Sequence, residues 1–93
     1  MMTFIYPAVF TPHKEDPGYH AYFPDLEGCQ ADGPDLEDAM DNAREAAYNW
    51  ICVELEEEFV ELPEVSHEDD ISLEEGQFVR QMMIVVKLMP DND

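Results

Sequence analysis

Apolar and polar residues alternate in blocks that predict short strands around one long helix. Residues 3–10 are mostly apolar and aromatic, which favours a strand, and Pro7 confines that strand to an edge or an irregular pairing. The polar and turn residues of 12–18 predict a hairpin loop, and the aromatic run 19–23 is the expected partner strand. Residues 29–31 are predicted to form a third short strand.

The segment after Gly33 has the spacing of an amphipathic helix. Asp35 suits the N-cap position, and Asp38 can complete a capping box three residues later. The helix is expected to run from Leu36 to about Glu58, with one apolar face made of Ala39, Met40, Ala43, Ala46, Ala47 and Trp50. A second apolar stripe packs under a later segment or meets another subunit; it consists of Tyr48, Ile51, Cys52, Leu55 and Phe59.

A last strand is predicted near the carboxyl end. Residues 54–75 contain 11 acidic residues and no Lys or Arg, which is typical of a solvated connection. Residues 78–88 are too rich in apolar and β-branched residues for a surface helix. Both faces of this strand are apolar, one of them interrupted by Arg80, so the strand is central or lies at a subunit contact.

This β-β-β-α-β order predicts an α+β fold of two layers. One long helix is expected to cross an antiparallel sheet of three or four strands. Ninety-three residues make one domain, which buries somewhat more than ~60% of its extended-chain surface. Because such a core is small, and because the first and last strands offer unpaired surface, we expect a homodimer or a higher homo-oligomer.

The most distinctive stretch joins the second predicted strand to the helix. It reads Phe-Pro-Asp-Leu-Glu-Gly-Cys over 23–29, then a short strand, a Gly-Pro-Asp turn at 33–35 and the helix start. This order resembles the HicB-like antitoxin family, which has an aromatic strand ending in F-P-D-L-x-G-C and a helix that begins with E/D-A-hydrophobic-x-N-A. The matching residues are Tyr6, Phe23, Pro24, Asp25, Leu26, Gly28, Cys29, Gly33, Asp38, Ala39, Met40, Asn42 and Ala43.

The resemblance implies both a fold and a role. The HicB amino-terminal domain is described as a reduced ribonuclease H fold, and HicB antitoxins bind HicA toxins, small basic proteins that cleave messenger RNA, and cover the toxin's active surface. HicB-type domains are not regarded as nucleases. Many HicB proteins carry a DNA-binding segment after this domain. Only residues 89–93 follow the predicted last strand here, so residues 1–93 are expected to form a single HicB-like domain without that carboxy-terminal module.

Each motif residue also has a local structural reason for its place. Pro24 lacks an amide donor and ends the strand, Asp25 can bond its own backbone to start a turn, and Gly28 permits a positive φ. We therefore interpret the motif as mainly structural.

The charge of the chain restricts its partners. Twenty-three acidic residues against four basic ones give a net charge of −19, which repels phosphate backbones and attracts basic proteins. No binding of nucleic acid by this domain alone is expected. Candidate partner-binding residues lie at the acidic helix end and near two loops: Asp16, Asp25, Glu54, Glu56, Glu57 and Glu58. The alternative is a stand-alone acidic interaction or charge-mimic domain without a toxin partner, and acidity can also serve solubility alone.

Nothing in the sequence supports catalysis or a bound cofactor. A two-metal nuclease site needs converging carboxylates, and Asp25, Asp32, Asp35 and Asp38 are the candidates, but capping and turn roles already account for three of them. The three histidines lack metal-pair spacing, and no GxSxG turn or phosphate loop occurs. Cys29 and Cys52 are expected to be reduced thiols. No apolar run reaches the ~18 residues of a membrane span, so a cytoplasmic protein without membrane contact is expected.

Overall fold

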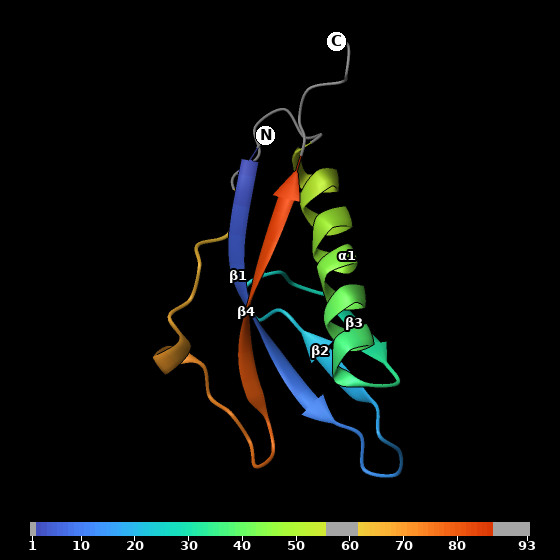
Figure 1. Ribbon diagram of the computed structural model, residues 1–93. Helices are drawn as coiled ribbons and strands as arrows, with labels where there is room; N and C mark the ends of the chain where they lie inside the picture. The colour runs from blue at the N-terminus through green and yellow to red at the C-terminus, as the bar shows by residue number, and fades with distance from the viewer. Residues whose placement is uncertain (1, 56–61, 87–93) are drawn as a thin grey trace.

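The computed structural model describes residues 2–55 and 62–86, which form an antiparallel sheet with one helix across it (Figure 1). The elements are β1 (Met2–Pro12), β2 (Tyr19–Tyr22), β3 (Gln30–Gly33), α1 (Leu36–Leu55), a 3-10 turn η1 (Glu68–Asp70) and β4 (Phe78–Val86). The strands lie in the order β3-β2-β1-β4, and every neighbouring pair is antiparallel. The predicted two-layer α+β fold is confirmed.

The first strand lies in the middle of the sheet, so of the two alternatives drawn from Pro7, an edge strand or an irregular pairing, the edge strand is excluded. β1 pairs with β4 from Met2 to Phe10 and with β2 only from Val9 onward. Pro7 therefore lies where β1 has one paired neighbour, opposite Gln81 of β4. A residue without an amide hydrogen is tolerated there because only one ladder runs past it.

The last strand lies at an edge of the sheet, which excludes the central position that its two apolar faces had suggested. Met82, Ile84 and Val86 face α1 and are buried in the core. Met83 and Val85 point to the opposite face and are exposed. The other alternative for this strand, a subunit contact, stays a prediction.

Small residues let α1 lie close against the sheet. Ala39, Ala43, Ala47 and Ile51 repeat every four residues and are fully buried. Ile51 therefore belongs to the main apolar face and not to a second stripe. At the helix start the Asp38 amide donates to the Asp35 carboxylate at 2.8 Å, which confirms Asp35 as the N-cap. Glu56, Glu57, Glu58 and Phe59 lie outside the described residues.

Aromatic side chains fill the end of the core near the β2 hairpin. Phe10 stacks on Phe78 with ring centroids 5.6 Å apart, and Tyr19 meets Phe78 edge-on. The Arg80 guanidinium covers the same ring at 4.7 Å from its centroid, so this charge interrupts the inner face of β4 as predicted. These contacts show cross-strand packing by Phe10 and Tyr19.

The segment 62–77, called here the connection, packs against part of the sheet face opposite α1. Gln77 donates to the Thr11 hydroxyl at 2.9 Å, and Gln81 donates to Glu68 at 3.0 Å. Pro7 and Val9, which point to this face, are buried. Ile5, Met83 and Val85 lie beyond the connection and stay exposed. Within the described residues no helix is long and apolar enough to span a membrane.

Candidate functional site

The 23–29 motif folds into a closed turn between β2 and β3. The Phe23 amide donates to the Cys29 carbonyl at 3.1 Å, and the Cys29 amide donates to the Leu26 carbonyl at 2.9 Å. Gly28 has a φ of 80°, a value that favours glycine. The turn directs the Leu26 side chain into the core, where it is fully buried, while Pro24 stays exposed. The motif thus fixes the path of the chain from the sheet to the helix.

Two motif residues fasten the connection to the sheet. The Tyr6 hydroxyl donates to the Pro63 carbonyl at 2.6 Å, and the Asp25 carboxylate accepts bonds from the Ser66 amide, at 2.7 Å, and from the Ser66 hydroxyl. Burial, and then the nearby Asp25 charge, raise the pKa of Tyr6, so its hydroxyl keeps the proton that it donates. We call Tyr6, Asp25, Pro63 and Ser66 the clamp. No sequence signal pointed to it, because its partners lie 41 and 57 residues apart.

The helix is bonded to the motif turn and to β3. Asn42 donates its side-chain amide to the Asp32 carbonyl at 2.7 Å, which gives this motif residue a role in joining α1 to β3. The Trp50 indole donates to the Glu27 carbonyl at 2.9 Å. Together with the buried Ala39 and Ala43, these bonds hold the turn, β3 and α1 as one unit.

A histidine and carboxylate cluster ties the hairpin loop to β3. Both ring nitrogens of His13 meet a carboxylate: Nδ1 lies 2.7 Å from Asp16, and Nε2 lies 2.8 Å from Asp32. His20 lies 3.0 Å from the other oxygen of Asp32. A neutral imidazole has one N–H, so only protonated His13 donates to both carboxylates. The bonds to Asp32 and then to Asp16 raise the pKa of His13.

We expect this cluster to stabilise the fold most in mildly acidic solution. The raised pKa of His13 gives stability that is complete below its ordinary value of 6.5 and is lost as the pH rises through the folded value. The pKa of Asp32 is lowered by His20 and then His13, and that of Asp16 by the Gly18 amide and then His13. The stability that these two aspartates contribute is complete above pH 3.8, their ordinary pKa, and is lost as the pH falls through their pKa values in the folded chain.

At a pH between the folded pKa values of the two aspartates and that of His13, His13→Gln should lower the melting temperature. This loss should shrink at alkaline pH, where His13 is neutral. Thermal unfolding of both proteins across the pH range measures this. An NMR titration that places the pKa of His13 at or below its ordinary value would contradict it.

Three of the four aspartates considered for metal binding are engaged in separate places. Asp25 belongs to the clamp, Asp32 to the histidine cluster, and Asp35 caps α1. Within residues 2–55 and 62–86, no three His, Cys, Asp or Glu side chains are arranged to hold a metal ion. Burial raises the pKa of the Cys29 thiol to about 11, so this motif residue carries no thiolate at neutral pH.

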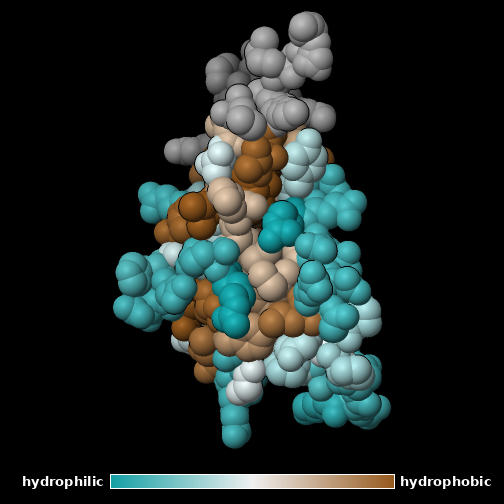
Figure 2. Space-filling view, in the orientation of Figure 1, coloured by the Kyte–Doolittle hydropathy of each residue, from teal (hydrophilic) through white to brown (hydrophobic). Residues whose placement is uncertain are grey.

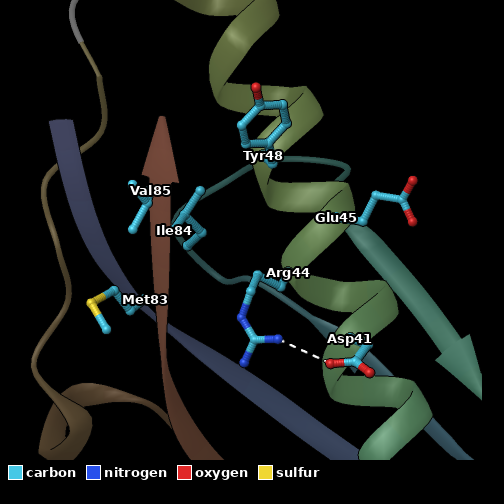
Figure 3. A pocket seen from close by; sticks show the side chains of 7 residues that line it. All are labelled: Asp41, Arg44, Glu45, Tyr48, Met83, Ile84 and Val85. Carbon is cyan, nitrogen blue, oxygen red and sulfur yellow. Dashed lines mark hydrogen bonds and ion pairs between the residues drawn. The ribbon is translucent and has the colours of Figure 1, made fainter. Parts of the chain in front are cut away.

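A groove of about 360 Å³ lies on each side of α1. The β3-side groove is lined mainly by Gly28, Cys29, Ala46, Trp50, Val53 and Glu54. The β4-side groove lies between Asp41, Arg44, Glu45 and Tyr48 of α1 and Met83, Ile84 and Val85 of β4 (Figure 3). In both grooves apolar side chains stand beside acidic ones.

The structure does not bring the predicted partner-binding residues together. Asp16 lies in the histidine cluster, Asp25 in the clamp and Glu54 in the β3-side groove. The other three candidates, Glu56, Glu57 and Glu58, lie outside the described residues. Sequence reasoning missed the apolar part of the β3-side groove, since Trp50 was assigned to the core and Val53 to no face.

Comparison with known proteins gives one family and several similar folds. Residues 6–92 match the model of the HicB-like antitoxin of bacterial toxin-antitoxin systems. A chain of a HicA3 and HicB3 toxin-antitoxin complex is 30% identical, with a TM-score of 0.67 over 89% of this chain and 100% of that one. No curated protein sequence matches the chain.

Two further structures share the fold at lower identity. A chain of a toxin-antitoxin complex from Streptococcus pneumoniae has a TM-score of 0.79 at 20% identity, over 90% of this chain and 70% of that one. The N-terminal domain of the Burkholderia pseudomallei antitoxin HicB has a TM-score of 0.69 at 23% identity, over 91% of this chain and 100% of that one. The four-stranded sheet with one helix is therefore the architecture of HicB N-terminal domains.

Proposed function

Since the chain belongs to the family of HicB-like antitoxins of bacterial toxin-antitoxin systems, we propose that it binds a small basic HicA-type toxin and covers its RNA-binding, active surface. The observation that carries the proposal is the family match over residues 6–92, together with the 30% identical chain in the complex of HicA3 and HicB3. The family and these neighbours point to a non-catalytic role. The toxin would be silenced by being covered and not by a reaction.

The charge of the chain supports this kind of partner. A protein that binds RNA presents positive charge to phosphates, and a surface of net charge −19 is complementary to it. Opposite charges speed the encounter, while buried apolar and aromatic side chains supply most of the affinity. A toxin-binding surface therefore needs an apolar centre next to acidic residues.

The β3-side groove fits that description. The Val53 residue that lines the groove is 59% exposed, and Trp50, which also lines it, is half-buried. Glu54 lines the groove. Glu27 is exposed, and its backbone carbonyl accepts the hydrogen bond from the indole of Trp50, which lines the groove. Gly28 and Cys29 of the family motif also line it. We assign the toxin contact to this groove.

Co-expression and salt titration test the function itself. We expect the chain to restore growth of cells that express a HicA-type toxin encoded next to it. Calorimetry with the purified pair should show affinity that falls at least about tenfold from low to high salt, because salt screens the opposing charges. Absence of both rescue and binding would refute the antitoxin function. Binding of an unrelated basic protein instead would favour the stand-alone charge mimic.

Two matched valine substitutions test the groove. Val53→Arg places a positive charge in the β3-side groove and should weaken toxin binding about tenfold or more. Val65→Arg is the control, because Val65 is 55% exposed on the connection and the change adds the same charge. Its affinity should stay near that of the unchanged chain. Equal weakening by the two variants would refute the groove as the contact while leaving the antitoxin function intact.

A further inference from the structure

The outer edge of β4 is open for strand pairing. β4 ends the sheet, and among the described residues no strand pairs with its outer side. Edge strands present unpaired N–H and C=O groups, and natural proteins usually protect them with lysine, proline, a bulge or short length. β4 spans nine residues without proline or lysine, and its one charged residue, Arg80, lies near its start. The opposite edge strand, β3, has only four residues and includes Asp32.

Residues 81–86, the part of β4 that follows Arg80, are uncharged in a strongly acidic chain. Residues 81–86 read Gln-Met-Met-Ile-Val-Val, and Met83 and Val85 are 55% and 43% exposed. Ile5, which pairs with Met83, is 49% exposed on the same face. Figure 2 shows an apolar strip between hydrophilic surfaces on either side. A basic partner gains little from this strip, whereas two acidic copies repel each other least across it.

We propose that β4 pairs antiparallel with β4 of a second copy, around a two-fold axis at Ile84, and joins two four-stranded sheets into one. A two-fold contact uses the same patch on both copies. In this register Met83 lies opposite Val85 of the second copy on the open face. Met82 lies opposite Val86 of the second copy on the face that carries α1. The buried side chains of β4 thus lie opposite buried side chains of the second β4, on the same face of the joined sheet. The alternation of side chains between the two faces of a strand requires this.

The β4-side groove is suited to the same arrangement. Arg44 extends from α1 toward β4 and bonds Asp41 at 3.0 Å, whereas the Glu45 side chain points away from Arg44 (Figure 3). The two-fold axis puts both α1 helices on one face of the joined sheet, so their β4-side grooves open into one cavity. Arg44 of each copy then faces the acidic groups of the other. The Tyr48 side chain, which is exposed in one copy alone, would be buried further in that cavity.

This interface does not use the proposed toxin surface. The β3-side groove lies on the other side of α1, so a dimer keeps both copies of it free. Salt should also act in opposite directions on the two contacts. It weakens attraction to a basic toxin, but it screens repulsion between two acidic copies and so strengthens the dimer.

Light scattering over a concentration series tests the dimer. The unchanged chain should reach twice the mass of one chain, at lower concentration when salt is added. Met83→Lys and Val85→Glu should each raise the dissociation constant about tenfold or more, because each puts one charge against an apolar neighbour. Val65→Lys is the control for Met83→Lys, with the same charge on an equally exposed side chain, and should leave the dimer unchanged.

The double variant tests the register. Met83→Lys with Val85→Glu places opposite charges across the axis twice, so it should recover most of the lost association. Failure to recover, or a monomer at every concentration and salt, would overturn the proposal.

Hydrogen exchange of the unchanged chain gives a second measurement that does not depend on any variant folding. Pairing on both sides protects every amide of residues 81–86, whereas a free edge leaves alternate amides exchanging rapidly. Rapid exchange at alternate positions would likewise contradict the dimer.

Discussion

Replacement of Gly33 by alanine is expected to destabilise the chain by about 3 kcal/mol or more. A Cβ atom on Gly33 would lie 2.7 Å from Ala39 Cα and 2.8 Å from the Asp38 carbonyl carbon, and closer still to the Ala39 nitrogen. These are backbone atoms of the first turn of α1, and they cannot rotate away as a side chain can. The helix would have to move off β3.

That movement would reach the rest of the helix contact. It would pull Ala39 and Ala43 from the sheet and stretch the 2.7 Å bond between Asn42 and the Asp32 carbonyl. Urea unfolding followed by circular dichroism measures the loss.

Gly28→Ala is the control for this prediction. Gly28 has a φ of 80°, but no atom lies within 4 Å of its added Cβ. Its substitution should cost only the strain of a positive φ, about 1–2 kcal/mol. Both glycines belong to the same motif, so the comparison separates a glycine required by close packing from one required by backbone conformation. An equal loss for the two variants would contradict the packing explanation.

Local signals in the sequence were enough to predict the elements of the fold. The helix could be placed because Asp35 caps it and alanines recur every four residues behind the cap. The strands could be placed because aromatic and β-branched residues gather between turn residues. These features depend on neighbours within a few positions, and each of them is visible in the printed sequence.

The order of the strands could not be obtained in the same way. Pro7 favoured an edge position for β1, and the two apolar faces of β4 allowed a central one, yet the sheet places β1 inside and β4 outside. Pairing between the residues of β1 and β4, which are 68 to 84 positions apart, is decided by the closure of the whole core and not by the residues of either strand. A proline is tolerated in β1 because the second neighbouring strand begins to pair only at Val9.

The interactions around the motif show the same limit. Asp25 reads as a turn residue in the sequence, but in the structure its carboxylate holds Ser66, 41 residues later. His13 reads as part of a solvated loop, but it contacts both Asp16 and Asp32, the latter 19 residues further along the chain. Polar side chains in turns have many possible partners, so only the folded chain shows which one each residue meets. The motif is therefore more deeply structural than its turn chemistry suggests.

Leu26→Ala is expected to destabilise the chain by about 2–5 kcal/mol, the range for truncating a fully buried leucine. The motif turn sends the Leu26 side chain into the core, because the bonds among Phe23, Leu26 and Cys29 close the turn around it. Its loss leaves a cavity in the core, and the bond from Trp50 to the Glu27 carbonyl, which fixes the turn to α1, limits how far the turn can move to fill it. Denaturant unfolding measures the change.

Two further substitutions identify the cause of that loss. Leu73→Ala removes the same atoms from a residue that is 44% exposed on the connection, and it should change the stability by no more than about 0.5 kcal/mol. Leu26→Met keeps most of the volume and should cost less than about 1.5 kcal/mol. Toxin binding by the methionine variant should then match that of the unchanged chain, because Leu26 acts on the partner only by holding the turn in place. A stable Leu26→Ala variant would show that the motif turn does not depend on this anchor.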